Sequence, residues 1–237
     1  MVDLNCDMGE GMVNDEAIMP YITSANIACG YHAGDEDIMK RTVELCLKYN
    51  VAIGAHPSYF DHENFGRSEI DLPPGQVYTL VKKQIQLLKE ITEESKALLQ
   101  HVKPHGALYN RSAKDVLIAK AIAVAVKDVD KDLVLFGLSG SHSIEEAKKV
   151  GLKTKSEVFA DRTYRDDGSL TPRTQSNALI EEEEKSIQQV LQIVHEGFVT
   201  TVSGKSISII AETICIHGDG KNAVQFAKRL NEVLKVK

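Results

Sequence analysis

Short apolar runs that alternate with longer amphipathic segments constrain this chain more than any other feature of its sequence. A strand buried on both faces has a nearly continuous run of Val, Ile, Leu and Ala. Seven segments have this character, at residues 2–6, 24–29, 51–55, 98–102, 133–138, 153–159 and 213–217. Because helical segments separate them, we predict parallel strands joined by right-handed helical crossovers.

The apolar residues between these strands recur at helical spacing. We predict helices at residues 35–49, 74–99, 113–127, 143–150, 180–195 and 221–236. Gly151 and Gly197 come just after the fourth and fifth of these helices, as glycine commonly does at a helix C-terminus. Residues 197–210 instead indicate a hairpin of two short strands, with a tight turn at Ser203-Gly204-Lys205.

The choice between an open sheet and a closed barrel depends on where the polar residues fall. They follow nearly every predicted strand, whereas an open sheet gathers them at one switch point. No glycine-rich dinucleotide fingerprint follows the first strand. The length of 237 residues lies within the range of one α/β barrel. We therefore predict a single domain over residues 1–237, an α/β TIM-like barrel of about seven parallel strands.

Composition argues against several classes of protein. With 43% apolar and 26% charged residues, the chain can bury a core, which argues against disorder. The net charge of −6 and the lack of a Lys/Arg cluster argue against a nucleic-acid partner. Its four cysteines form no C-x-x-C pair, which favours a reducing compartment. Because no signal peptide and no apolar run of roughly 20 residues is present, we expect a cytoplasmic protein without a membrane partner.

Several histidines follow the predicted strands. Five of the eight fall at such positions: His32, His56, His105, His217 and, less clearly, His142. A lone histidine is more often a hydrogen-bonded structural residue than a catalytic one. A barrel, however, brings the loops at the carboxyl ends of its strands around one pocket. We therefore interpret this set as part of one site, and the remaining three as structural or surface residues: His62, His101 and His195.

A divalent metal ion is one interpretation of this set. Asp7, His32, His56 and His217 offer the nitrogen and oxygen ligands that such ions accept. No H-x-x-x-H or H-E-x-x-H spacing supports it. The alternative is substrate binding and proton transfer without a metal, and ligand type alone leaves the choice open.

One segment resembles the end of a phosphate-binding loop, Ser203-Gly204-Lys205-Ser206. The motif requires a glycine where this chain has Val199, and a helix where strand-like residues follow. The chain therefore shows no recognisable ATP-binding motif of its own.

Six blocks carry most of these polar residues. They are residues 3–10 (DLNCDMGE), 24–35 (SANIACGYHAGD), 54–57 (GAHP), 101–110 (HVKPHGALYN), 157–162 (EVFADR) and 214–219 (ICIHGD). In sequence and order, the blocks resemble the LamB/YcsF family, whose members are known as the A subunits of 5-oxoprolinases. The resemblance implies a barrel similar to those of glycoside hydrolases and deacetylases. It also implies hydrolysis of 5-oxo-L-proline to L-glutamate with partner subunits B and C, and ATP as co-substrate, with Mg²⁺ at one of those partners.

Opening an activated lactam needs a base for water, an acid for the ring nitrogen and positive groups for the developing negative charge. Within the resembling blocks, we expect Asp7 or His56 as the base and His105 or His32 as the acid. Lys103 would stabilise the anionic oxygens.

A substrate-binding set would surround these catalytic residues. Arg67 or Arg162 would hold the substrate carboxylate, because a guanidinium is a planar bidentate donor. Asn5, Asn26 and Glu157 would orient the reacting groups. The remaining members of the expected set are His217 and Asp219.

Two other functions are compatible with the sequence. A metal-dependent amide or carbohydrate deacetylase could use the same barrel, and it would need a metal but no ATP. The chain could instead be a non-catalytic subunit that binds the substrate while its partners perform the chemistry.

Overall fold

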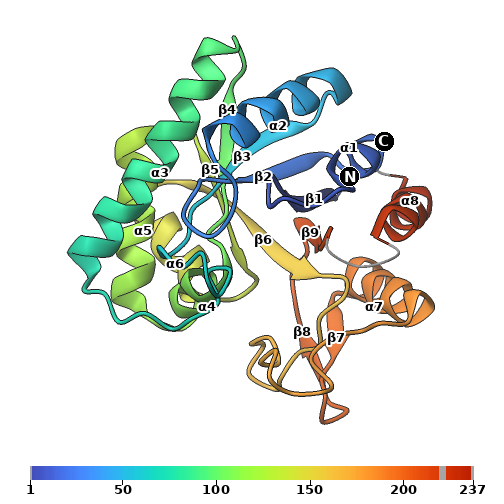
Figure 1. Ribbon diagram of the computed structural model, residues 1–237. Helices are drawn as coiled ribbons and strands as arrows, with labels where there is room; N and C mark the ends of the chain where they lie inside the picture. Colours follow the sequence, from blue (N-terminus) through green and yellow to red (C-terminus); the bar gives the residue numbers. More distant parts are fainter. Residues whose placement is uncertain (1, 219–222, 236–237) are drawn as a thin grey trace.

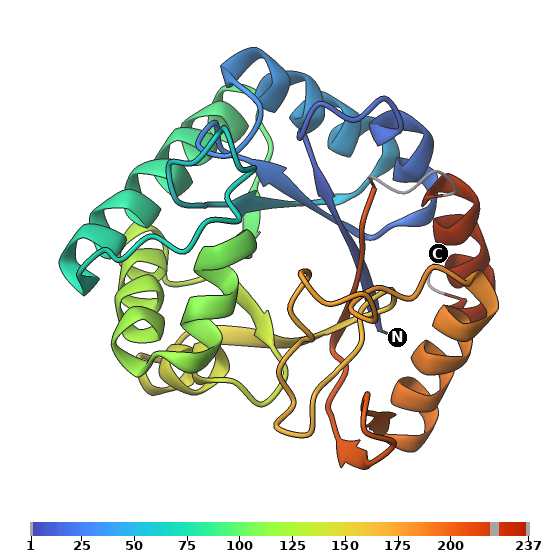
Figure 2. The ribbon, with the colours of Figure 1, turned by 60° about the horizontal axis from the view of Figure 1, so that its bottom comes forward.

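Seven parallel strands close into a barrel, and helices pack around its outside (Figures 1 and 2). The computed structural model describes residues 2–218 and 223–235. The barrel strands are β1 Asp3–Met8, β2 Ser24–Ala28, β3 Ala52–His56, β4 Leu99–Val102, β5 Val134–Leu138, β6 Lys153–Phe159 and β9 Thr213–Ile216. They pair in sequence order, and β9 closes the barrel by pairing with both β6 and β1. All seven predicted strands are confirmed, with small shifts at their ends.

The two faces of β1 show how the barrel divides apolar from polar residues. Successive side chains of a strand point to opposite faces. Asn5 hydrogen-bonds to Glu157 of β6 and Thr213 of β9, so this face of β1 points into the barrel. Leu4 and Cys6 point the other way and belong to the apolar core. The barrel interior is therefore polar beneath its mouth, and the apolar core lies largely between strands and helices.

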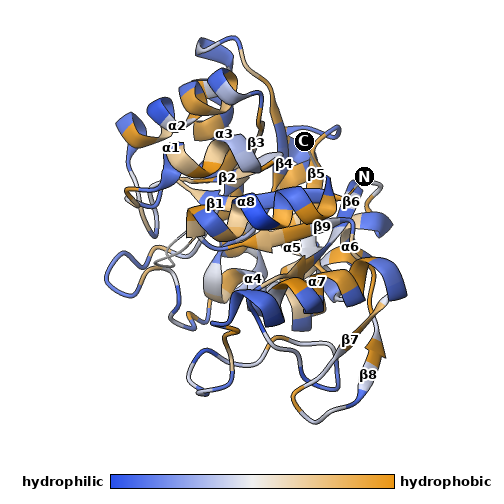
Figure 3. Ribbon diagram, turned by 90° about the vertical axis from the view of Figure 1, so that its right-hand side faces the viewer, coloured by the Kyte–Doolittle hydropathy of each residue, from blue (hydrophilic) through white to orange (hydrophobic). Residues whose placement is uncertain are grey.

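Helices surround the strands in a ring. They are α1 Asp15–Ile18, η1 Met19–Tyr21, α2 Glu36–Tyr49, α3 Pro74–Glu94, α4 Gly106–Lys114, α5 Val116–Val129, α6 His142–Lys149, α7 Glu183–Glu196 and α8 Ala223–Leu234. Figure 3 shows mainly hydrophobic strands and helices of mixed character, as expected for helices that cover a sheet with one face. Within the described residues, no helix combines the length and apolar character needed to cross a membrane.

Two helix predictions are wrong in their bounds. The helix predicted at residues 74–99 ends at Glu94, because Lys96 adopts a positive φ of 56° and Leu99 begins β4. The helix predicted at 113–127 corresponds to α5, and its first two residues instead end a separate helix, α4. Asp115 separates them, since its carboxylate accepts from the backbone N–H groups of Leu117 and Ile118 and caps α5. The prediction missed α4 because its residues carried chemical motifs and were assigned to a loop.

The predicted hairpin is confirmed. Strands β7 Phe198–Thr200 and β8 Ser206–Ser208 pair antiparallel beside the barrel (Figure 1). Gly204 lies in the turn with a φ of 87°, a conformation that glycine adopts without strain. The segment that resembles a phosphate-binding loop is therefore a hairpin turn.

Candidate active site

The carboxyl ends of β1, β3, β4, β6 and β9 meet around one cavity of about 600 Å³. Parallel strands of a barrel all deliver these ends to the same rim, which explains the convergence. The cavity wall includes seven residues that were selected from the sequence: Asp7, His56, Arg67, Lys103, His105, Arg162 and His217.

Lys103 lies at the centre of a buried charged group in this cavity. Its Nζ is 2.9 Å from Asp7 Oδ1, 3.0 Å from Glu157 Oε1 and 3.0 Å from Cys215 Sγ. Burial alone would lower the pKa of Lys103, but Asp7 above all outweighs it and raises that pKa well above its usual value. Burial alone would raise the pKa of Asp7, but His56 and Lys103 hold it well below its usual range. The pair is therefore a buried ammonium and carboxylate at neutral pH.

Asn5, Asn26 and Glu157 lie inside the barrel, fully buried beneath this pair. Asn5 Nδ2 donates to Glu157 Oε1 at 3.0 Å, and Asn26 Nδ2 donates to Asp7 Oδ1 at 2.8 Å. From the sequence, we expected these three residues in the substrate-binding set as orienting groups. Their hydrogen bonds suit the orienting role, because they hold the carboxylates that face Lys103.

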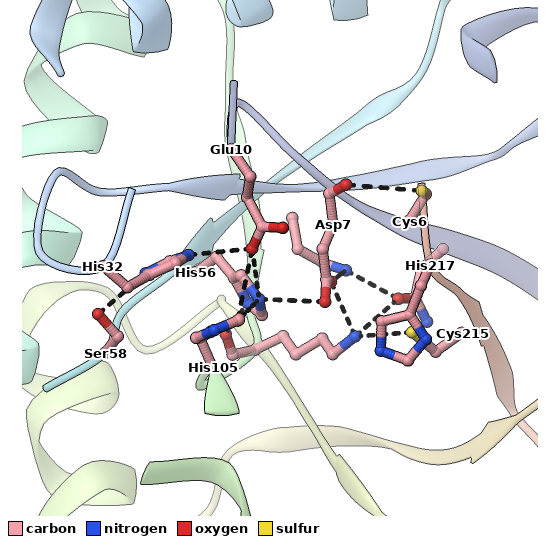
Figure 4. Close-up of polar contacts among 12 residues, drawn as sticks. Cys6, Asp7, Glu10, His32, His56, Ser58, His105, Cys215 and His217 are labelled. Carbon is pink, nitrogen blue, oxygen red and sulfur yellow. Dashed lines mark hydrogen bonds and ion pairs between the residues drawn. The ribbon is translucent and has the colours of Figure 1, made fainter. Parts of the chain in front are cut away.

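A second group, the histidine cluster, consists of Glu10, His32, His56 and His105 (Figure 4). Glu10 Oε1 is 3.0 Å from His32 Nε2 and 3.4 Å from His105 Nδ1. His56 Nε2 is 2.8 Å from His105 Nδ1 and 3.2 Å from Asp7 Oδ2, so it links the two groups. His32 is buried behind Glu10, whereas the other three members line the cavity.

Glu10 is a functional candidate that was not selected from the sequence. The signal was present, because Glu10 lies three residues after Asp7, just beyond the end of β1 and in the same block of residues 3–10. Burial raises the pKa of Glu10 to about 7, and the Asp7 carboxylate adds to the effect. Burial also lowers the pKa of His32 to about 2 and that of His105 well below its usual range. Neutral imidazoles at these two positions are therefore favoured.

His217 occupies a different part of the site from His32 and His105 (Figure 4). Its Nδ1 lies 2.7 Å from Asp161 Oδ2, and its Nε2 lies 3.0 Å from Arg173. Because the Asp161 carboxylate accepts, Nδ1 carries the proton and Nε2 accepts from the Arg173 guanidinium. Burial alone would lower the pKa of His217, but Asp161 outweighs it and the net change is upward. Arg173, which also lines the cavity, had no role in the sequence-based expectations.

The expected carboxylate-binding arginines differ in their surroundings. Arg162 is buried, and it donates to the carbonyl oxygens of Thr171 at 2.6 Å and Ala178 at 3.3 Å. It therefore holds the loop between β6 and α7, and its guanidinium group already donates hydrogen bonds within the protein. Arg67 lies at the cavity wall, 5.0 Å from the centre of the Phe65 ring. Asp219, the last expected member of the set, lies outside the described residues.

The remaining histidines do not line the cavity. His142 begins α6 and is half-buried, with its Nδ1 3.0 Å from Glu145 Oε2. His62 and His195 are exposed, and His101 is buried inside the barrel. The interpretation of His62, His101 and His195 as structural or surface residues agrees with these positions, whereas His142 does not join the cavity wall.

The four metal ligands considered from the sequence fall into two groups. His32 and His56 converge with Glu10 and His105, whereas Asp7 and His217 converge with Cys215. The site therefore holds two separate sets of ligand atoms rather than the single set first considered.

Comparison with known proteins agrees with the fold and with the resemblance. Residues 2–237 match the LamB/YcsF family. The chain is 53% identical over 239 residues to the 5-oxoprolinase A subunit of Shouchella clausii, covering 99% of this chain and 94% of the relative. It is 51% identical over 239 residues to the 5-oxoprolinase A subunit of Oceanobacillus iheyensis, covering 99% and 93%. The crystal structure of the lactam utilization protein from Thermus thermophilus is 38% identical and matches with a TM-score of 0.91, covering 99% of this chain and 97% of that chain.

Proposed function

This chain belongs to the LamB/YcsF family, and we propose that it is the A subunit of an ATP-dependent 5-oxoprolinase that hydrolyses 5-oxo-L-proline to L-glutamate with partner subunits B and C. The observation that carries the proposal is the similarity over almost the whole chain to relatives that are named as 5-oxoprolinase A subunits. The cavity supports it, because the blocks that carry the family resemblance supply half of its Asp, Glu, Lys and Arg residues and all three of its histidines.

The chemistry accounts for the need for ATP. A lactam carbon is a poor electrophile, and transfer of the ATP γ-phosphoryl group to the lactam oxygen makes it a better one. Water then adds to the ring carbon and gives up a proton to a base. As the C–N bond breaks, the ring nitrogen takes a proton from an acid, which leaves an acyl phosphate. A second water hydrolyses this to the side-chain carboxylate of glutamate and phosphate.

The positions of the cavity residues suit these steps. Asp7, which faces the cavity as a carboxylate, is the candidate base for the attacking water. The Lys103 ammonium lies next to it and would stabilise the anionic oxygens that develop on the substrate. His217 lines the cavity and its pKa is raised, so its protonated form is the candidate acid for the ring nitrogen, whereas the lowered pKa of His105 disfavours the expected acid role there. Arg67 and Arg173 at the cavity wall are the candidate partners of the substrate carboxylate.

The test is glutamate release from 5-oxoproline and ATP in three mixtures: this chain alone, this chain with subunits B and C, and those subunits without it. We expect release only when all three subunits are present. Undiminished release without this chain would reject the proposal. ATP-independent amide hydrolysis by this chain alone would instead favour the metal-dependent hydrolase.

A matched pair of variants separates catalysis from substrate binding. Asp7→Asn in the complete mixture should abolish turnover at saturating substrate, whereas Asp132→Asn, at an exposed loop carboxylate, should leave it unchanged. If Asp7→Asn raised only the KM and left kcat intact, the chain would be a substrate-binding subunit whose partners perform the chemistry.

A further inference from the structure

The histidine cluster directs four potential ligand atoms at one point. They are Glu10 Oε1, His32 Nε2, His56 Nε2 and His105 Nδ1, and all lie within 4.8 Å of one another. The three histidines follow β2, end β3 and follow β4, so neighbouring strands hold them together. Figure 4 shows the three rings turned toward the Glu10 carboxylate.

The other nitrogen of each ring is committed as a donor. His56 Nδ1 lies 2.7 Å from the Lys103 carbonyl oxygen, and His105 Nε2 lies 2.9 Å from the Phe65 carbonyl oxygen. Because a carbonyl oxygen only accepts, both nitrogens carry the hydrogen.

The same holds for His32 through a serine hydroxyl. His32 Nδ1 lies 2.9 Å from Ser58 Oγ, which itself donates to the Tyr59 carbonyl oxygen at 2.9 Å. The Ser58 oxygen therefore accepts from His32 Nδ1. In its neutral form each ring carries its one N–H on the outer nitrogen, and its inner nitrogen then presents a lone pair to the centre of the cluster.

The closest contacts in the cluster then join acceptor to acceptor. The inner nitrogens of His56 and His105 are 2.8 Å apart, and His32 Nε2 is 3.0 Å from the Glu10 carboxylate. Lone pairs at these distances repel unless positive charge lies between them. Two added protons would relieve the two contacts separately, whereas one divalent cation among the four atoms relieves both.

Second partners such as these are typical of histidines that bind metals. A metal-ligating histidine usually donates its other N–H to a carbonyl or carboxylate, which fixes the ring and the tautomer. The neighbouring set of Asp7, Cys215 and His217 differs, because the Lys103 ammonium already lies 2.9 Å from Asp7 Oδ1 and 3.0 Å from Cys215 Sγ. A cation in that second set would be repelled.

We propose that Glu10, His32, His56 and His105 bind one divalent transition-metal ion of the Zn²⁺ class. Three imidazole nitrogens and one carboxylate oxygen suit such an ion, whereas Mg²⁺ and Ca²⁺ prefer oxygen ligands. Because Glu10, His56 and His105 line the cavity, the ion would be within reach of a bound carbonyl or phosphoryl oxygen, which it would polarise. Coordination of His105 would leave His217 as the acid for the ring nitrogen.

The inference goes beyond the proposed function, and its test uses the isolated chain without partner subunits or ATP. The chain is stripped with a chelator and titrated with Zn²⁺ by calorimetry, and with Co²⁺ by visible absorption. We expect one ion per chain in both titrations and no binding of Mg²⁺ at the same concentration. X-ray absorption of the Zn²⁺ form should show only nitrogen and oxygen ligands, at about 2.0–2.2 Å. Absence of metal binding would not contradict the proposed lactam activity, and absence of lactam activity would not contradict metal binding.

Three variants locate the ion. Glu10→Gln and His105→Ala should each weaken Zn²⁺ binding by at least about 100-fold, the upper end of what changes outside the ligand shell produce. His195→Ala, at an exposed histidine of α7, should bind like the wild type. The proposal is overturned if the wild-type chain binds no stoichiometric ion, if sulfur appears among the ligands, or if only His195→Ala weakens binding. The first two results concern the wild type and do not depend on the folding of any variant.

Discussion

Lys103 Nζ lies 2.9 Å from Asp7 Oδ1, and both side chains are almost fully buried, with 3% and 8% of their side-chain surface exposed. Such a pair stabilises a fold only weakly, because desolvation offsets the attraction, but removal of one partner leaves an uncompensated charge. The same ion pair therefore affects both the charge distribution of the cavity and the stability of the barrel.

The first prediction separates these two effects. Lys103→Met should abolish glutamate release in the complete enzyme and lower the free energy of unfolding by about 3–5 kcal/mol, since Asp7 and Glu157 lose their ammonium partner. Lys103→Met combined with Glu157→Gln should recover part of that stability but none of the activity. Denaturant unfolding and glutamate release measure the two quantities. Equal stability of the single and double variants would contradict the charge pairing.

The second prediction concerns Ser58, the acceptor of the His32 Nδ1 hydrogen. Ser58→Ala should weaken Zn²⁺ binding by about 10–100-fold, because the His32 ring loses the partner that fixes its tautomer. Calorimetric titration of the isolated chain measures the affinity. Ser112→Ala provides the control, since Ser112 is also a buried, hydrogen-bonded serine, paired with Ser143. Unchanged binding in Ser58→Ala would show that this hydroxyl does not position a ligand.

The third prediction concerns Gly54 in β3, which pairs with His101 in β4. A Cβ at position 54 would overlap the His101 ring, which stacks on Phe136 with ring centres 4.2 Å apart. Gly54→Ala should therefore lower the free energy of unfolding by about 1–3 kcal/mol, as overpacking does. Gly75→Ala is the control, because no atom lies within 4 Å of a Cβ there. Denaturant unfolding should show a large difference between these variants, and equal midpoints would refute the packing argument.

The fourth prediction concerns Asp3 and acid stability. Burial alone would raise its pKa, but Lys155 and the hydroxyls of Ser24, Thr213 and Thr23 outweigh it and lower that pKa. A lowered folded-state pKa gives stability that is present above the unfolded value of about 3.9 and is lost as the pH falls through the folded value.

Asp3→Asn should therefore destabilise the protein by about 1–3 kcal/mol at pH 7. The difference from the wild type should shrink below about pH 4, where the unfolded carboxyl is protonated. Denaturant unfolding between pH 7 and pH 3 measures this. Asp132→Asn, at an exposed position, should show no such convergence. A difference in the Asp3 variant that stays constant with pH would exclude the carboxylate as its source.

The sequence by itself determined the seven strands and the hairpin, because burial on both faces and turn chemistry leave local patterns. It also selected the residues that meet at the barrel mouth, since parallel strands carry their carboxyl ends to one rim. The six blocks also identified the family, and most of their residues lie at or just after the ends of strands.

Only the tertiary structure decided how these residues combine. Glu157 and Asn5 touch across 152 positions of sequence, and Lys103 reaches Asp7 across 96, so neither contact has a local signal. Glu10 joined the site because the barrel brings three histidines from neighbouring strands around it. Strand order and register set these distances, and those properties arise from packing the whole chain.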